Sequence, residues 1–232
     1  LRAEGVRYGV ADAVFDEDLR VLGAAARDHR LITGGSGIAM GLPANLRDAA
    51  TLGAAGAATV PAVEGRAVVF AGSCSTATLG QIAAVKDEWP TARIDVDRVA
   101  AGDDIAAQLV EWARRQPAEG PVLIYASAGP DEVAAIQSRY GTERAGAMVE
   151  GTFGTLAKRL HADGFNRVVV AGGETSGAVV SALGVNVLRI GPEIAPGVPW
   201  TEAVGEKPLA LALKSGNFGG RTFFADAFAM LP

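Results

Sequence analysis

One pattern recurs along the 232-residue chain: a short apolar run, a cluster of Gly and Ser, and then a stretch with helical periodicity. Several of the apolar runs are nearly continuous, which is typical of strands covered on both faces in a parallel sheet. The runs are Arg30–Thr33, Ala67–Ala71, Ala92–Val96, Val122–Ala126, Arg167–Ala171, Val185–Ile190 and Leu209–Lys214. Strands that alternate with helices predict an α/β fold, a layered and mostly parallel sheet flanked by helices.

Three helices are predicted from apolar residues that recur at helical spacing. Their stripes are Leu19-Leu22-Ala26, Ile105-Leu109-Trp112 and Val149-Phe153-Leu156-Leu160. We expect Thr142 to cap the third helix and Gly164 to end it. The segment Thr51–Gly65 carries few signals and is either a connection or a loop followed by an Ala-rich helix. We expect one domain over residues 1–232.

The composition narrows the class of protein. With 49% hydrophobic and 20% charged residues, the chain is expected to be globular. A net charge of −5 argues against a general nucleic-acid surface. The single cysteine rules out an internal disulfide and favours a reducing compartment, the cytoplasm. No apolar run approaches the roughly 18 residues that span a bilayer, and the first residues do not resemble a signal peptide.

The glycines gather where the predicted strands end. Thirty of the 232 residues are glycine, and five Gly/Ser clusters follow predicted strands, at 34–37, 72–75, 127–129, 172–177 and 215–220. Ligands of open α/β sheets bind at this edge, and small residues there let backbone N–H groups approach an anion. Any one cluster is best explained as a tight turn. Five on one edge instead favour a phosphate-bearing ligand such as a nucleotide, bound at the carboxyl ends of the strands.

Other sites receive less support. The chain has no P-loop motif, and the stretch 33–41 matches a dinucleotide fingerprint only weakly, because its spacing is G-x-G-x-x-x-G. An NAD-dependent oxidoreductase that uses this turn stays an alternative. Cys74 has no nearby His and is expected to be a small packing residue rather than a nucleophile. No spacing of His, Cys, Asp or Glu predicts a metal site.

Three motifs carry a family resemblance: GGETSGAVV at 172–180, IGPEIAPGVP at 190–199 and LALALKSGNFGG at 209–220. The segments 10–19, 31–43 and 72–81 agree with it in order. The sequence resembles the carboxyl-terminal, nucleotide-binding half of the four-carbon acid sugar kinases along essentially the whole chain. One departure is Thr222, where many members are expected to carry an acidic residue, so a role for this position is in doubt.

The resemblance implies that the chain binds ATP and Mg²⁺ and serves to phosphorylate 3-oxo-tetronate, threonate or erythronate, with the 3-oxo-tetronate 4-kinase type favoured. Family members also have an amino-terminal half with an Asp-Asp motif that binds the acid sugar, and we expect it to be absent here. It would supply the catalytic base, so no catalytic residue is assigned. The chain alone is expected to bind ATP without turnover. A nonenzymatic nucleotide-binding module remains an alternative function, and a homo-oligomer remains an open possibility for the assembly.

The resemblance and the residue chemistry together nominate the phosphate-binding groups. Ser73 and Ser75 offer hydroxyls or amides to phosphate, or Ser75 caps the following helix. Gly172 and Gly173 let the backbone pass close to the nucleotide, and Thr175-Ser176 offers donors at a helix start.

The remaining candidates have two interpretations each. Glu174 holds a ribose hydroxyl or a Mg²⁺-bound water, or it is a first-turn acid that favours the helix dipole. Lys214 places a charge on a phosphate or is an exposed strand end. Gly216, Asn217 and Gly219 are expected to form a turn with positive φ that brings amides toward the ligand.

Overall fold

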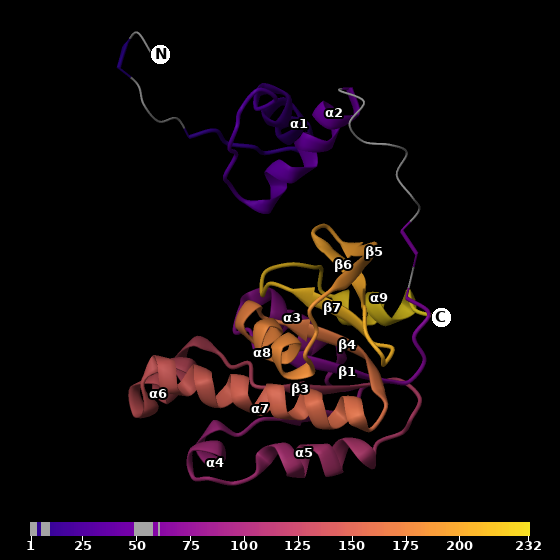
Figure 1. The fold of residues 1–232 in the computed structure, drawn as a ribbon. Coiled ribbons are helices and arrows are strands. Elements are labelled where there is room, and N and C mark those ends of the chain that lie inside the picture. Colours follow the sequence, from indigo (N-terminus) through magenta and orange to yellow (C-terminus); the bar gives the residue numbers. More distant parts are fainter. Residues whose placement is uncertain (1–3, 6–9, 49–57, 60) are drawn as a thin grey trace. The chain divides into compact units, whose positions relative to one another are not determined.

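The computed structural model describes residues 4–5, 10–48, 58–59 and 61–232 (Figure 1). Its contacts divide the chain into two compact units, Leu1–Ala57 and Ala58–Pro232. The sequence predicts one nucleotide-binding domain over the whole chain, and the assignment of both units to one domain stays a prediction. Most of the segment 51–65 that the sequence left open lies outside the described residues.

The first unit consists of helices α1 (Asp16–Ala25), η2 (Ser36–Gly41) and α2 (Leu42–Asp48). A Cβ built on Gly23 would overlap the backbone of Gly41, so glycine is needed where these segments meet. The predicted strand Arg30–Thr33 is wrong, because the run forms a loop and Leu31 is 83% exposed. An apolar, β-branched run becomes a strand only where a neighbour pairs with it, and the described residues of this unit supply none.

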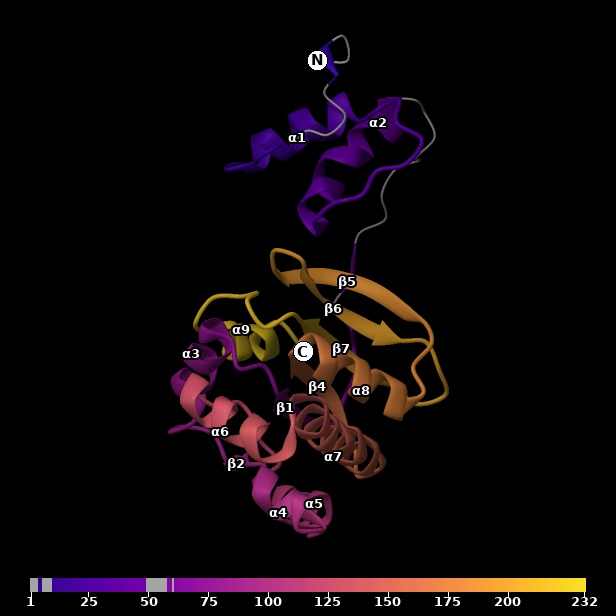
Figure 2. The ribbon, with the colours of Figure 1, turned by 90° about the vertical axis from the view of Figure 1, so that its left-hand side faces the viewer.

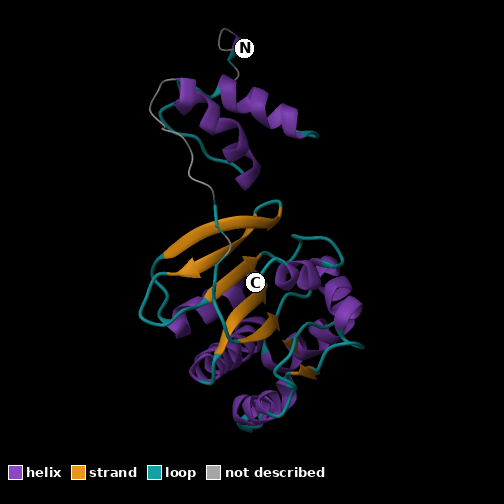
Figure 3. Ribbon diagram, turned by 90° about the vertical axis from the view of Figure 1, so that its right-hand side faces the viewer, coloured by secondary structure: helices purple, strands orange, loops and turns teal. Residues whose placement is uncertain are grey.

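The second unit is built on a seven-stranded sheet with the order β2-β3-β1-β4-β7-β6-β5 (Figures 1 and 3). The strands β2, β3, β1, β4 and β7 are parallel, whereas β6 and β5 add an antiparallel edge. Their bounds are β1 Arg66–Ala71, β2 Thr91–Arg93, β3 Pro121–Tyr125, β4 Phe165–Ala171, β5 Leu188–Ala195, β6 Val198–Ala203 and β7 Ala210–Lys214.

Helices cover both faces of this sheet, which confirms the predicted layered α/β fold (Figure 2). Helices α5, α7 and α8 pack on the face that includes Val68 and Phe70. Helices α3 and α9 pack on the face that includes Val69 and Ala71. The helices of the unit are α3 Thr76–Val85, α4 Val96–Ala100, α5 Ile105–Arg114, α6 Pro130–Tyr140, α7 Thr142–Ala162, α8 Gly173–Leu183 and α9 Phe223–Ala229.

Several boundaries differ from the prediction; the strand predicted at Val185–Ile190, for example, is observed at Leu188–Ala195. Two of the differences have clear local reasons. The strand predicted at Ala92–Val96 ends at Arg93, because the side chain of Asp95 accepts backbone N–H groups and starts α4. Gly141, with φ of 81°, precedes α7, so Thr142 is its first helical residue rather than its cap. None of the helices in the described part of the chain is both long and apolar enough to cross a membrane.

The segment 190–199 differs more. Three prolines in so short a segment favour a stiff loop, but β5 and β6 form a hairpin through it. Pro196 lies in the turn beside Gly197, whose φ is 77°, while Pro192 and Pro199 lie within the strands. The pairing of β5 with β6 is interrupted by register shifts, and β5 is an edge strand. Irregular pairing and sheet edges both tolerate proline, which has no N–H donor.

Candidate functional site

Three Gly/Ser loops meet at one edge of the sheet, because the strands before them are parallel neighbours. We name them the β1 loop (72–75), the β4 loop (172–175) and the β7 loop (215–220). The N–H of Gly72 donates to the carbonyl of Ala171 at 3.0 Å, and the N–H of Gly172 donates to the carbonyl of Lys214 at 2.9 Å. The sequence prediction that Gly/Ser clusters converge at one edge is confirmed for these three loops, but it is wrong for the cluster 34–37, which follows a loop rather than a strand.

The loops approach so closely that side chains would not fit at several points. A Cβ on Gly72 would overlap the hydroxyl of Thr175, and one on Gly216 would overlap the hydroxyl of Ser73. Gly172 has φ of 134°, a conformation that L side chains rarely adopt. The glycines thus serve contacts between the loops themselves.

The serine hydroxyls of the β1 loop form hydrogen bonds with other groups of the protein. The Ser75 Oγ accepts the N–H of Thr78 at 3.2 Å and donates to the carbonyl of Gly216 at 2.6 Å. The Ser73 Oγ accepts the N–H of Ser75 at 3.2 Å. Ser75 therefore caps α3, as one of its two interpretations predicts. The role of both serines toward a phosphate stays a prediction.

Lys214 is buried at the end of β7, with 1% of its surface exposed. Its Nζ donates to the Thr78 Oγ1 at 3.0 Å and to the carbonyl of Gly216 at 2.9 Å. Burial lowers the pKa of this amine to about 8, since water no longer solvates the charged form. The interpretation as an exposed strand end is wrong. Its other interpretation, a charge that compensates a phosphate, stays a prediction.

The β4 loop leads directly into α8, whose first turn begins at Gly173. The N-cap residue Gly172 makes no side-chain capping bond, so N–H groups of the first turn remain available. Glu174 is exposed in this turn, where its negative charge interacts favourably with the positive end of the helix dipole. The side chain of Thr175 is buried. The Oγ of Ser176 is buried without a hydrogen-bond partner among the described residues.

The β7 loop is held by α3. The Gln81 Nε2 lies 3.0 Å from each of the carbonyl oxygens of Phe218, Gly219 and Gly220, and Gln81 is completely buried. Gly219 has φ of 80°, as predicted. Among the glycines of this loop no other has positive φ, so the prediction is wrong for Gly216. Asn217 is exposed.

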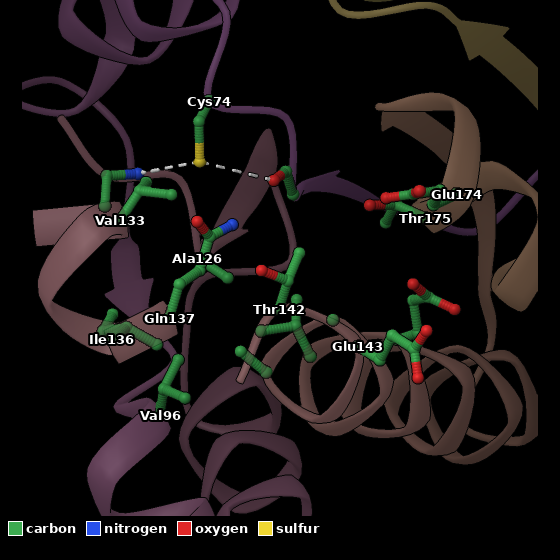
Figure 4. Close-up of a pocket in the computed structure, with 16 residues that line it drawn as sticks. Cys74, Val96, Ala126, Val133, Ile136, Gln137, Thr142, Glu143, Glu174 and Thr175 are labelled. Atoms are coloured by element: carbon green, nitrogen blue, oxygen red, sulfur yellow. Dashed lines mark hydrogen bonds between the residues drawn. The ribbon is translucent and has the colours of Figure 1, made fainter. Parts of the chain in front are cut away.

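A cavity of about 350 Å³ opens beside the β1 and β4 loops (Figure 4). Gly72 and Cys74 border it from the β1 loop, and Glu174 and Thr175 border it from the β4 loop. Of the residues nominated from the sequence, only Glu174 and Thr175 line this cavity, and no residue of the β7 loop does. The structure thus brings all three loops together but gives only two of them access to the cavity.

The rest of the cavity wall comes from residues that sequence reasoning missed. Ala126 and Ala128 follow β3, Val133 and Ile136 lie on α6, and Val149 lies on α7. The cluster 127–129 marks this edge in the sequence, but the helices after it show no sign of a site. Helix α6 has no buried residues, so its apolar periodicity is weak.

Cys74 also departs from the prediction. It is exposed at the cavity rather than packed in the core, and its Sγ accepts the N–H of Ala128 at 3.5 Å. Ser127 holds the neighbouring backbone in place, since its buried Oγ donates to the carbonyl of Ser73 at 2.6 Å. The end of β3 therefore fixes the conformation of the β1 loop.

Three carboxylates line the cavity, those of Glu143 and Glu150 on α7 and that of Glu174 in the β4 loop. Figure 4 shows Glu143 and Glu174 on the same side of the cavity. Within the described ranges, no group of three His, Cys, Asp or Glu side chains can hold a metal ion. Mg²⁺ commonly binds through one or two carboxylates and the phosphates of a substrate, and carboxylate oxygens of this kind fit it. Such a cation would also offset the repulsion between these carboxylates and a phosphate.

A cavity at the carboxyl ends of parallel strands, bordered by Gly/Ser loops and a helix N-terminus, defines a nucleotide-binding α/β domain. Comparison with known proteins agrees. Residues 68–224 match the model of the nucleotide-binding C-terminal domain family, and the chain belongs to this family. The resemblance noted in the sequence is confirmed.

The relatives extend beyond this chain. A 3-oxo-tetronate kinase of Pseudomonas fluorescens is 53% identical over 232 residues, which make up 100% of the chain and 54% of that kinase. A 3-oxo-tetronate kinase of Cupriavidus necator is 54% identical over 233 residues, with the same shares. A solved Haemophilus influenzae protein of the DUF1537 family is 39% identical with a TM-score of 0.76, and the match covers 100% of this chain and 55% of that one. The chain spans about half the length of the curated relatives it matches.

Proposed function

We propose that this chain is the ATP-binding half of a cytoplasmic kinase that phosphorylates the terminal hydroxyl of a four-carbon acid sugar, of the 3-oxo-tetronate type. One observation carries the proposal: the β1 loop, the β4 loop and the N-terminus of α8 border one cavity. The names of the relatives supply the acceptor class. Threonate and erythronate, which the sequence resemblance also suggests, serve as competing acceptors in the test.

The phosphates bind where backbone amides are free. The first turn of α8, after Gly172 and Gly173, presents N–H groups together with the positive end of the helix dipole. The hydroxyl of Ser176 has no partner in the described part of the chain, and rotation of its side chain brings a donor to this turn. Glu174 holds a water molecule of Mg²⁺ or a ribose hydroxyl.

Lys214 acts behind the β1 loop. Its amine makes no ion pair with a carboxylate among the described residues, so its positive charge is not cancelled locally. A charge in a region of low dielectric acts over several ångströms. It therefore favours an anion at the serines of the β1 loop, while Gly216, Asn217 and Gly219 maintain the backbone around it.

The acceptor site lies in the part of the relatives that this chain does not match. Phosphoryl transfer needs alignment and charge compensation rather than a covalent protein intermediate. We assign Mg·ATP to this chain, and the acid sugar and the carboxylate that accepts its hydroxyl proton to the other half. A homo-oligomer would carry one such site in each subunit.

Calorimetric titration of the 232-residue chain with Mg·ATP and with NAD tests the proposal. We expect ATP to bind and NAD not to bind, and we expect no ADP when 3-oxo-tetronate, threonate or erythronate is added. The chain joined to the remaining half should release ADP fastest with 3-oxo-tetronate. Binding of ATP without turnover by the joined protein would instead support the nonenzymatic module.

Binding of NAD would support the oxidoreductase. The structure removes the main argument for that alternative, because residues 33–41 lead from a loop into the short helix η2. A dinucleotide fingerprint needs a strand before its glycines and a helix after them.

A further inference from the structure

The cavity has two ends of different chemistry. Glu174 and Thr175 lie at a polar end, whereas Val133 and Ile136 of α6 lie at the opposite, apolar end (Figure 4). We infer that this apolar end, between α6 and α7, binds the purine base of the nucleotide and that Gly146 and Gln137 determine which base fits. The inference rests on the proposed function, since it places the base of the same ATP.

The wall suits a flat, uncharged ring better than an acid sugar. It consists mainly of aliphatic side chains, and no Lys or Arg is among the described residues that line the cavity. A sugar acid carries a carboxylate that a protein usually pairs with a cationic side chain. A purine instead gains from apolar burial, and a cavity of about 350 Å³ lies within the usual range for small-molecule sites.

The position of the wall fits the length of a nucleotide. In the sheet, Ala71 at the end of β1 pairs with Tyr125 of β3 on one side and with Ala171 of β4 on the other. The step from the β4 loop to the residues after β3 is therefore two strand spacings, about 10 Å. This is the reach from a purine ring to its phosphates, so phosphates at the first turn of α8 bring the base to the wall formed by α6 and α7.

Two residues give the cavity its selectivity for a base. Gly146 lines the cavity from α7, and a Cβ built there would meet only the carboxylate of Glu150, at 3.5 Å. A glycine at this point leaves room for a ring against the helix. Gln137 lines the cavity from α6 (Figure 4), and its side-chain amide makes no hydrogen bond to the described part of the chain. An amide offers both a donor and an acceptor, the pair that an adenine edge requires.

Matched variants on one helix test the inference. Gly146→Leu places a side chain in the cavity, whereas Gly151→Leu changes the same helix at a glycine that lies outside this cavity and has open space around it. Both changes improve helix propensity, so both variants should fold, and thermal unfolding checks this. The affinities for Mg·ATP and for inorganic tripolyphosphate are measured by calorimetry.

We expect Gly146→Leu to weaken ATP binding at least about tenfold while tripolyphosphate affinity changes less than about twofold. Gly151→Leu should leave both affinities unchanged. We also expect Gln137→Ala to reduce the preference for ATP over GTP several-fold. If wild-type protein binds ATP and Gly146→Leu binds it equally well, the base lies elsewhere and this inference is wrong. If wild-type protein binds no ATP, the proposed function itself fails.

A second pair of variants covers a failure of Gly146→Leu to fold. Ile136→Asp puts a charge into the apolar wall, and Ala135→Asp puts the same charge on the exposed surface of α6, at a position that does not line the cavity. Helix α6 has no buried residues, so neither change disturbs a core. Only Ile136→Asp should weaken ATP binding, again with tripolyphosphate affinity retained. Equal ATP affinities of the two variants would overturn the inference.

Discussion

The β4 loop and the β7 loop have similar compositions but different surroundings. Both follow parallel strands and both are rich in glycine. The β4 loop borders the cavity with Glu174 and Thr175, whereas the β7 loop does not line the cavity and contacts protein groups instead. A glycine cluster therefore predicts that something approaches the backbone closely, but it does not say whether this is a ligand or another part of the protein.

The difference originates on α3. Ser75, Thr78 and Gln81 are spaced three residues apart, so they lie on one side of the helix. Ser75 and Thr78 donate to the carbonyl of Gly216, and Gln81 donates to the loop carbonyls that follow it. Because this polar stripe binds the β7 loop, the loop acts as a support for the β1 loop.

A change at Gly72 should produce the largest effect, because it alters both stability and binding. In Gly72→Ala the new Cβ overlaps Thr175 and lies 3.2 Å from the ring of Phe153, which is fully buried. We expect the free energy of unfolding to fall by about 3–4 kcal/mol and ATP affinity to fall at least about tenfold. Urea unfolding and calorimetric titration measure the two quantities.

The control lies in the β7 loop. Gly219→Ala meets the ring of Phe223 at 2.5 Å and needs φ near 80°, so it should also destabilise the protein, by about 2–3 kcal/mol. Its ATP affinity should stay within about twofold of wild type, provided the variant is folded during titration. If the two variants lose ATP affinity to the same extent, the distinction between the loops is wrong.

Lys214 makes the β7 side of the site sensitive to pH. Burial lowers its pKa from 10.5 to about 8 in the folded state. Between these values the unfolded chain holds the proton that the folded chain has released, so raising the pH favours folding. The free energy of unfolding should rise across pH 8 to 10.5 by up to about 3 kcal/mol from this group.

Other groups titrate in the same range, so Lys214→Met is the reference. The variant replaces the amine by an uncharged side chain of similar length, and its stability should lack this rise. Denaturant unfolding of both proteins at a series of pH values gives the difference curve. Parallel stability curves from pH 7 to 10.5 would contradict the role of burial at Lys214.

A substitution of Gln81 tests whether α3 supports the β7 loop. Gln81→Leu removes the donor that three carbonyls of the β7 loop share, and a buried acceptor without a partner is costly. We expect a loss of about 2 kcal/mol in the free energy of unfolding. The exposed Gln108→Leu should change it by less than about 0.5 kcal/mol. A Gln81→Leu variant as stable as Gln108→Leu would show that the loop does not depend on α3.

Much of the second unit could be predicted from the sequence because burial leaves a local pattern. The strand β1 is covered on both faces, so five consecutive residues after Arg66 are apolar. The convergence of the loops follows from the same pattern, because parallel strands place their carboxyl ends on one edge. For the same reason, the glycines that follow the predicted strands indicated the edge of the sheet at which the candidate site lies.

The rest depended on contacts that no local pattern shows. The burial of Lys214 requires Thr78, which lies 136 positions earlier in the chain. The run Arg30–Thr33 has the composition of a strand but no partner among the described residues of its unit. The hairpin β5–β6 contains prolines that are tolerated only because of its edge position and its irregular register. The cavity wall of α6 and α7 likewise forms only when the helices are in place.

Substitution of Cys74 should have the smallest effect on stability. Chemical modification of its thiol shows directly whether a nucleotide reaches the β1 loop. It is the only cysteine of the chain and is exposed at the cavity, so N-ethylmaleimide should modify this one site. Cys74→Ser should change the free energy of unfolding by less than about 0.5 kcal/mol, since exposed substitutions rarely do more. Saturating Mg·ATP should slow the modification about tenfold by covering the thiol, and NAD should not. If ATP binds but the rate of modification stays the same, the nucleotide does not cover the β1 loop, and that loop is then a support in the same sense as the β7 loop.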